Sequence, residues 1–193
     1  MPRKKRDLAE NGFYHVFNRG ISKKHIQFGS MFHDIFFSQL ITAKYKFNIE
    51  IHAFCLMSNH YHLLLRTPDA NLDKFMQHFG SGLSRKINKL CGADGALFRS
   101  RYKSILVESH DYFIQLLKYI HLNPVDAHLT QLAETYELSS YSTYLCKTTI
   151  SWLTKEFALS FFNDIHAFKA FHETGTTAEI SKLFSKKQLP TTL

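Results

Sequence analysis

The chain has 193 residues, of which 45% are hydrophobic and 15% aromatic. This composition excludes a disordered protein and is sufficient for one domain with a core, with or without a small appendage. No apolar run approaches the roughly 20 residues that span a bilayer, and the basic cluster at residues 3–6 is not followed by the apolar stretch of a secretory signal. We therefore expect a soluble, intracellular protein that does not act at a membrane.

Positive charge is concentrated in the first half of the chain. Residues 1–109 contain seventeen Lys/Arg and eight Asp/Glu, which gives +9, whereas residues 110–193 contain seven and eight, which gives −1. A surface that binds phosphates produces such an asymmetry, because Lys and Arg release counterions from nucleic acid. A solvated basic face with a basic tail produces it equally well, so charge alone leaves both interpretations open.

The first part of the chain alternates between strand and helix patterns. An aromatic and β-branched segment predicts a strand over residues 12–19, and apolar residues at helical spacing predict a helix over 31–46. Alternation of side-chain character predicts a second strand over 48–57. A tight turn at 58–59 then leads into a third strand over 60–66, which closes a hairpin.

Another helix and strand follow the hairpin. Asn71 is a candidate N-cap for a helix with a clear apolar stripe that runs to about Leu90. Gly92 is a plausible C-terminal stop for this helix, because glycine adopts the left-handed conformation that helix ends favour. We expect a fourth strand over residues 96–108.

A further helix is expected to begin at Asp111. It should end near Asn123, because Pro124 disfavours helical geometry in the residue before it. Beyond this point the pattern weakens: residues 136–144 are loop-like, and two or three short helices are expected between about residues 152 and 184.

The resulting order, β-α-β-β-α-β-α, predicts an α+β protein. Its core would be a ferredoxin-like (RRM-like) split β-α-β unit with an antiparallel sheet, an added helix and a C-terminal helical extension. The predicted organisation is a basic tail at 1–11, a main domain at 12–125 and an accessory helical segment at 126–193.

His60 and His62 are a candidate metal-binding pair. Residues two apart on a strand point to the same face, so the two imidazoles project together while Tyr61 points to the other side. The pair alone is a weak signal, because the chain contains twelve histidines and such spacing arises easily by chance. No HExxH helix and no acidic cluster is present, which argues against a metalloprotease and against a calcium site.

Tyr119 and Asn123 lie four residues apart on the helix that begins at Asp111. At 3.6 residues per turn they are neighbours at the edge of the apolar stripe, so a phenol and a neutral oxygen ligand would stand side by side. An isolated tyrosine at such an edge is more often ordinary amphipathic packing. The partner asparagine favours a functional site.

Basic residues surround these motifs. Arg99, Arg101 and Lys103 alternate in the expected fourth strand and would share one face, and Arg85 adds charge near the end of the preceding helix. Cations interleaved with aromatic residues are typical of surfaces that bind single-stranded nucleic acid. We interpret the strand residues as phosphate contacts, whereas a solvated surface remains a fair alternative for the helix.

Together these motifs resemble one known family. The segment 60–62 is similar to the HUH motif, histidine-bulky apolar-histidine, of the single-tyrosine HUH transposases. Residues 119–125 are similar to the nucleophile helix of their IS200-like branch, which is related to the REP-associated tyrosine transposases. Residues 98–104 and 14–20 resemble the same branch, and the resemblance covers about residues 12–145.

The resemblance implies cleavage and rejoining of single-stranded or hairpin DNA, in transposition or REP-like hairpin processing, without a nucleotide cofactor. Carried over by position, it makes Tyr119 the nucleophile that forms a 5′-phosphotyrosine. It makes His60, His62 and Asn123 the ligands of a divalent metal, Mg²⁺ or Mn²⁺. It further implies a cytoplasmic bacterial enzyme, associated with the nucleoid when it acts on DNA, either as a homodimer or as a monomer.

Two other functions stay open. The same element order supports a non-catalytic RRM-like module that binds RNA or DNA through sheet aromatics. A domesticated relative would bind hairpin DNA in a host role. A metal site discriminates the first of these from an enzyme, because a pure binding module does not need one. Since protonated histidines release a metal, we also expect activity to fall below about pH 6.5.

Overall fold

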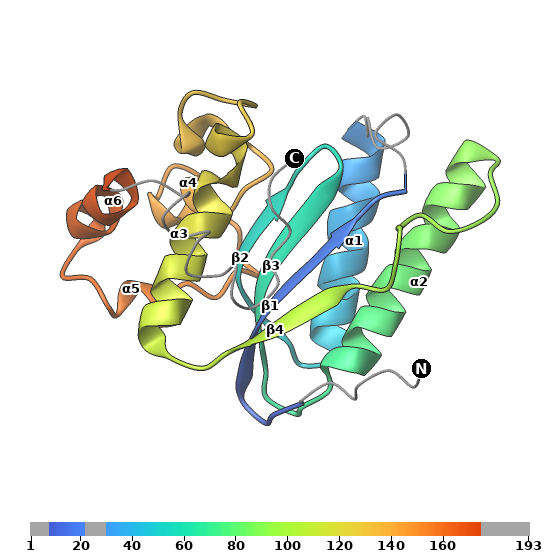
Figure 1. Cartoon of the computed structure of the whole chain (residues 1–193), viewed down its shortest axis with the longest axis horizontal. Helices are drawn as coiled ribbons and strands as arrows, with labels where there is room; N and C mark the ends of the chain where they lie inside the picture. Colours follow the sequence, from blue (N-terminus) through green and yellow to red (C-terminus); the bar gives the residue numbers. More distant parts are fainter. Residues whose placement is uncertain (1–7, 22–29, 175–193) are drawn as a thin grey trace.

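The computed structural model describes residues 8–21 and 30–174 (Figure 1). The strands are β1 (Gly12–Arg19), β2 (Glu50–Leu56), β3 (His60–Thr67) and β4 (Lys103–Val107). The helices are α1 (Ser30–Lys46), α2 (Leu72–Cys91), α3 (His110–Asp126), α4 (Tyr141–Tyr144), α5 (Glu156–Leu159) and α6 (Ile165–Glu173), with a 3₁₀ turn, η1 (Ala133–Thr135), before α4.

The four strands form one antiparallel sheet in the order β2-β3-β1-β4, which is the order of a ferredoxin-like split β-α-β core. Helices α1 and α2 cover one face of the sheet, and α3 lies on the other side with the short C-terminal helices (Figure 1). The predicted α+β fold class is therefore confirmed.

The side chains of β3 show how this arrangement follows from the sequence. The Tyr61 ring faces the first layer of helices, with ring centroids 5.3 Å from Phe36 of α1 and 5.9 Å from Phe79 of α2. His62, the next residue, points to the opposite face, where its ring centroid lies 5.5 Å from that of Tyr119 on α3. Successive side chains of β3 thus contact the α1 and α2 layer on one face of the sheet and α3 on the other.

Strand β4 is shorter than predicted, because it begins at Lys103 instead of residue 96. The preceding segment forms no regular ladder with β1, and an isolated bridge joins Phe98 to Gly20, the residue after β1. The side chain of Asn18 donates a hydrogen bond to the Ser100 carbonyl at 3.2 Å, so a side chain takes the place of regular ladder bonds there. The alternation of Arg99 and Arg101 was therefore not the pattern of a strand.

Helix α3 is longer than predicted, because it continues through Pro124 to Asp126. Proline removes one backbone donor, but only two helical residues follow it. The last turn keeps a bond from the Ala127 N–H to the Asn123 carbonyl at 3.0 Å. The Asn123 side chain also donates to the Tyr119 carbonyl at 2.8 Å. The expected stop at Asn123 was wrong for this reason.

The remaining predicted boundaries up to α3 agree with the structure within two residues. Gly92 ends α2 with φ of 58°, as expected for a left-handed cap. Asn71 precedes α2 as predicted, although its side chain donates to the Phe47 carbonyl at 2.9 Å and does not cap the helix.

The region after α3 folds back onto that helix. The segment predicted as loop-like contains the single turn α4, and Ser139 within it forms a bridge with Cys55 of β2. Two of the expected short helices are α5 and α6, and the part of that prediction beyond residue 174 lies outside the described residues, as does most of the predicted tail at 1–11. None of the described helices is long and apolar enough to cross a bilayer.

Candidate active site

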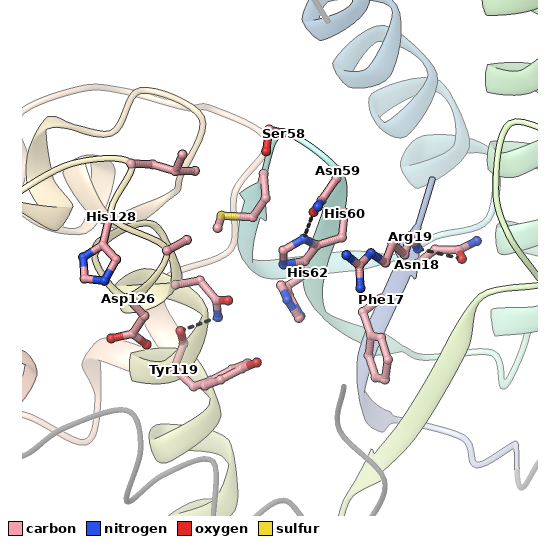
Figure 2. A pocket seen from close by; sticks show the side chains of 14 residues that line it. Phe17, Asn18, Arg19, Ser58, Asn59, His60, His62, Tyr119, Asp126 and His128 are labelled. Atoms are coloured by element: carbon pink, nitrogen blue, oxygen red, sulfur yellow. Dashed lines mark hydrogen bonds between the residues drawn. The ribbon is translucent and has the colours of Figure 1, made fainter. Parts of the chain in front are cut away.

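A cavity of about 420 Å³ lies where the end of β1, the β2–β3 turn and α3 meet. His60 and His62 project into it from β3, and Tyr119 and Asn123 line it from α3 (Figure 2). The four residues that the sequence places in two separate motifs therefore share one pocket. Their encounter depends on α3 packing across the sheet, which no local pattern reveals.

The two β3 histidines are held by partners at the same ring position. Nδ1 of His60 lies 2.5 Å from the Asn59 side-chain oxygen, which only accepts hydrogen bonds, so this nitrogen carries the proton. Nδ1 of His62 lies 2.9 Å from Nε2 of His15 on β1. Within the described part of the chain, neither Nε2 has a hydrogen-bond partner. Both remaining nitrogens are available at the pocket.

Burial keeps both imidazoles neutral. It lowers the pKa of His60 to about 4, and the nearby positive charge of Arg19 acts in the same direction. Burial also lowers the pKa of His62 far below its usual range, reinforced by His60 and His15. A neutral imidazole is the form that binds a metal, so both residues are in the protonation state that could hold a cation.

His15 was not among the predicted site residues, although it is completely buried beneath His62. For Nε2 of His62 to bind a metal, its Nδ1 must carry the proton and donate to His15. His15 then carries its own proton on Nδ1, a buried atom without a partner among the described residues. The sequence contains His15 in a predicted strand, but only the β1–β3 register shows that it shares a sheet face with His60 and His62.

Tyr119 is buried, with only 4% of its surface exposed, and its ring stands at 86° to the His62 ring. Its burial is deeper than the edge position that helical spacing predicted. Burial raises the pKa of the Tyr119 phenol, a hydrogen bond with Asn123 lowers it, and the carboxylate of Asp126 raises it. The phenol is neutral at pH 7, and a nearby cation is the natural means of favouring its deprotonation.

Asn123 completes a set of three neutral donors. Its amide nitrogen donates to the Tyr119 carbonyl at 2.8 Å, so its side-chain oxygen is the atom that could bind a metal. Two imidazole nitrogens and one amide oxygen suit Mn²⁺ well, while Mg²⁺ prefers more oxygen ligands. No group of three or more His, Cys, Asp or Glu side chains able to hold a metal occurs among the described residues.

Arg19 is a second residue that the sequence did not single out. It lies opposite His60 in the β1–β3 register and lines the pocket from the end of β1, with its guanidinium facing the histidines (Figure 2). A guanidinium is well suited to bidentate contact with a phosphate. The alternation of Phe17 and Arg19 along β1 is the pattern that could have indicated this residue.

Comparison with known protein families identifies the family of the chain. The family described as "Transposase IS200 like" matches residues 9–123, more than half of the chain. The chain belongs to this family. Its members are DNA-processing enzymes, and the family that the sequence motifs predicted is thereby confirmed.

One solved structure shares the fold over most of its length. It is a REP-associated tyrosine transposase bound to a REP hairpin, which matches with a TM-score of 0.67 and 14% identity, covering 80% of this chain and 98% of that one. A crystal structure of a protein from Deinococcus radiodurans R1 that was assigned as a transposase matches with a TM-score of 0.43 and 19% identity, covering 62% of this chain and 95% of that one. The family membership does not depend on this second match. No curated protein matches the chain significantly.

The predicted basic residues do not form one stripe in this family member. Lys103 lies on β4, and its ammonium is 6.0 Å from the ring centroid of Phe17, which lines the pocket that holds His60 and His62. Arg99 and Arg101 are exposed in the segment before β4 and line a different cavity, next to α2. Arg85 is exposed on α2, where its Nε donates to the Ser81 carbonyl at 3.4 Å. Of the four cations, only Arg99 and Arg101 line the same cavity.

Proposed function

We propose that this protein cleaves and rejoins single-stranded DNA by metal-dependent transfer to Tyr119, as a transposase or a processor of hairpin DNA. The observation that carries the proposal is the contact between the Tyr119 ring and the His62 ring in one pocket with His60 and Asn123. A nucleophile beside three potential metal ligands is the minimal equipment for phosphoryl transfer without ATP.

In the proposed first step, the Tyr119 oxygen attacks the scissile phosphorus as the phenol loses its proton. A bond forms between this oxygen and phosphorus, and the bond between phosphorus and the 3′ oxygen breaks. The leaving oxygen takes up a proton and becomes a free 3′-hydroxyl. The 5′ end remains on the protein as a phosphotyrosine, which conserves the phosphodiester energy, so a 3′-hydroxyl of another strand can reverse the step and complete strand transfer.

His60, His62 and Asn123 would hold the divalent metal, which when bound supplies positive charge that stabilises the developing negative charge on the phosphate. Arg19 would add a second positive charge from the opposite wall of the pocket. His15 and Asn59 would act as positioning residues, since each fixes one imidazole through its Nδ1 atom.

Hairpin DNA is the substrate that we infer from the structural comparison. The similar REP-associated tyrosine transposase was solved with a REP hairpin bound, and its fold covers four fifths of this chain. A basic first half of the chain is consistent with a polyanionic partner.

A non-catalytic RRM-like function is less well supported. RRM modules bind nucleic acid on the open face of the sheet through aromatic side chains. In this protein that face is covered by α3: the ring centroid of Phe13 on β1 lies 5.1 Å from Phe113 on α3 and 5.0 Å from Phe157 on α5. Phe13 is therefore not available for stacking with bases.

The test is formation of a covalent complex. The protein is incubated with Mn²⁺ and labelled hairpin oligonucleotides that carry single-stranded flanks from its own genomic neighbourhood, and the products are separated on a denaturing gel. We expect a protein-linked band that disappears in Tyr119→Phe and persists in Tyr112→Phe, a matched change on the same helix outside the pocket. A band that survives Tyr119→Phe, or none with any hairpin, contradicts the proposal.

A further inference from the structure

A second cavity, of about 830 Å³, lies between α2 and the segment 95–102. We call it the α2 groove. None of the residues to which we assign the transfer chemistry lines it, but Asn18 at the end of β1 lines both cavities. The backbone N–H of Arg99 donates to the Arg19 carbonyl at 2.9 Å, so a residue of the groove is hydrogen-bonded to a residue of the catalytic pocket. The two hollows are neighbours across one strand end.

The outer wall of the α2 groove is basic and aromatic. Arg99 and Arg101 are exposed on it, and Phe98 and Tyr102 are partly buried beside them. Phe98 is held by an edge contact with Tyr61, at 5.8 Å between ring centroids. Arginines bind phosphates and aromatic rings stack with unpaired bases, and single-stranded nucleic acid presents both groups.

The inner wall of the α2 groove is a polar helix face. Asp73, Gln77, Ser81 and Ser84 line it from successive turns of α2. These side chains accept and donate hydrogen bonds, as the edges of bases do. A carboxylate at one end repels phosphates and accepts from the amino groups of bases, which indicates that bases face α2 and that the backbone faces the arginines.

Gly80 keeps the middle of this wall open. It lies in the interior of α2, where glycine destabilises a helix by roughly 0.5–1 kcal/mol relative to alanine. A Cβ atom at this position would meet no other atom within 4 Å, so no packing within the described protein accounts for the glycine. The space that it leaves belongs to the groove.

We propose that the α2 groove binds unpaired nucleotides of single-stranded DNA adjacent to the scissile phosphate, with phosphates at Arg99 and Arg101 and bases against α2. This inference rests on the proposed function, because it adds a recognition site to the catalytic pocket. A strand that leaves the pocket past Arg19 reaches Arg99 directly, since the two residues are joined through their backbones. Residues of α2 would then contribute to the choice of the sequence that is cleaved.

Filling the groove tests this inference without disturbing the fold. Gly80→Phe places a ring in open space and improves helix propensity. Thr42→Phe is the matched control, because Thr42 is exposed on α1 and does not line the groove. Binding of a fluorescent single-stranded DNA of about 12 nucleotides is measured by anisotropy in EDTA, so that no chemistry contributes.

We expect Gly80→Phe to weaken single-strand binding about tenfold or more, the effect of losing a stacked base, and Thr42→Phe to leave it unchanged. The double change Arg99→Gln and Arg101→Gln should reduce the slope of log K against log salt by about 1.4, or about 0.7 for each lost phosphate contact. Equal affinity of wild type and Gly80→Phe overturns the groove assignment. If the affinities are equal and the Tyr119-dependent band still forms, the groove assignment fails and the proposed function is retained. If Gly80→Phe weakens binding but no covalent band forms, the groove stands and the proposed function fails.

Discussion

Two pairs of buried histidines, His121 with His172 and His15 with His62, differ in how many of their ring nitrogens have hydrogen-bond partners. His121 on α3 contacts Nε2 of His172 on α6 at 3.0 Å and Ser140 at 2.9 Å, and Nδ1 of His172 donates to the Phe168 carbonyl at 2.9 Å. All four ring nitrogens of this pair have partners.

The other pair, His15 and His62, uses only two of its four nitrogens for the bond at 2.9 Å between them. One remaining nitrogen, Nδ1 of His15, is buried without a partner among the described residues, and the other, Nε2 of His62, belongs to a residue that lines the pocket. Burial lowers the pKa in both pairs. A depressed pKa therefore does not distinguish a ligand from a structural histidine, whereas an unused nitrogen at a cavity does.

The largest effect that we predict is on the yield of the covalent DNA complex, which should depend on His62 and not on His121. His62→Ala should reduce the yield of the covalent DNA complex by at least about 1,000-fold, because a metal ligand is lost where charge must be stabilised. His121→Ala should retain the complex for every folded molecule. Denaturing gels, with circular dichroism to count folded protein, check both variants. Equal loss of activity in the two folded variants would remove the functional distinction.

The converse effect should appear in stability. His121→Ala leaves Nε2 of His172 without its partner, removes one of the hydrogen bonds of Ser140 and opens a cavity in a buried cluster. We therefore expect a loss of about 2–4 kcal/mol in the free energy of unfolding. Urea denaturation measures this loss. The result to set beside it is the stability of His15→Ala, which should fall less, since His15 already has an unpaired buried nitrogen. A larger loss for His15→Ala would reverse our assignment.

The positioning role of His15 can be measured separately. His15→Ala removes the atom that fixes the proton on Nδ1 of His62, and we expect Mn²⁺ affinity to fall roughly 10- to 100-fold. Isothermal titration with Mn²⁺ in a Tyr119→Phe background excludes any contribution from catalysis. Unchanged affinity would mean that the His15–His62 bond only supports the fold.

The last prediction concerns the pH dependence of stability. Burial lowers the pKa of His172 to about 4, below the value of about 6.5 in an unfolded chain, so the unfolded state binds a proton first as pH falls. The contribution of His172 to stability is complete above pH 6.5 and declines by about 1.4 kcal/mol per pH unit between pH 6.5 and about 4. Urea titrations at pH 7, 6 and 5 should show a shallower pH slope for His172→Gln than for wild type. Identical slopes would show that His172 titrates normally.

The pH dependence expected from the sequence alone also changes. A normal histidine pKa predicted loss of activity below about pH 6.5, whereas the lowered pKa of His60, about 4, moves protonation of this proposed ligand to more acidic conditions. Loss of stability should therefore precede loss of metal binding as the solution is acidified.

Local patterns predicted most of the fold because each signal was short-range. The aromatic and β-branched residues of 12–19, the glycine at position 92 and the apolar stripe of α2 need no knowledge of distant residues, and the structure agrees with all three. The failures have long-range causes. Asn18 bonds to Ser100 and ends the regular ladder of β4, and hydrogen bonds around Asn123 allow α3 to continue past Pro124.

The candidate site divides in the same way. The positions of His60 with His62 on one strand, and of Tyr119 with Asn123 on one helix, follow from the 2.0 and 3.6 periods. The contact between the two motifs, the support from His15 and the approach of Arg19 require the β1–β3 register and the packing of α3 on the sheet. No spacing along the chain contains that information.

The most direct test of the account is identification of the residue that becomes linked to DNA. Wild-type protein is incubated with Mn²⁺ and a cleavable hairpin oligonucleotide, digested with nuclease and protease, and analysed by tandem mass spectrometry. We predict a nucleotide attached through its 5′-phosphate to the Tyr119 oxygen. A nucleotide on any other residue, such as Tyr112, or a 3′-phosphate linkage on Tyr119, would contradict the account.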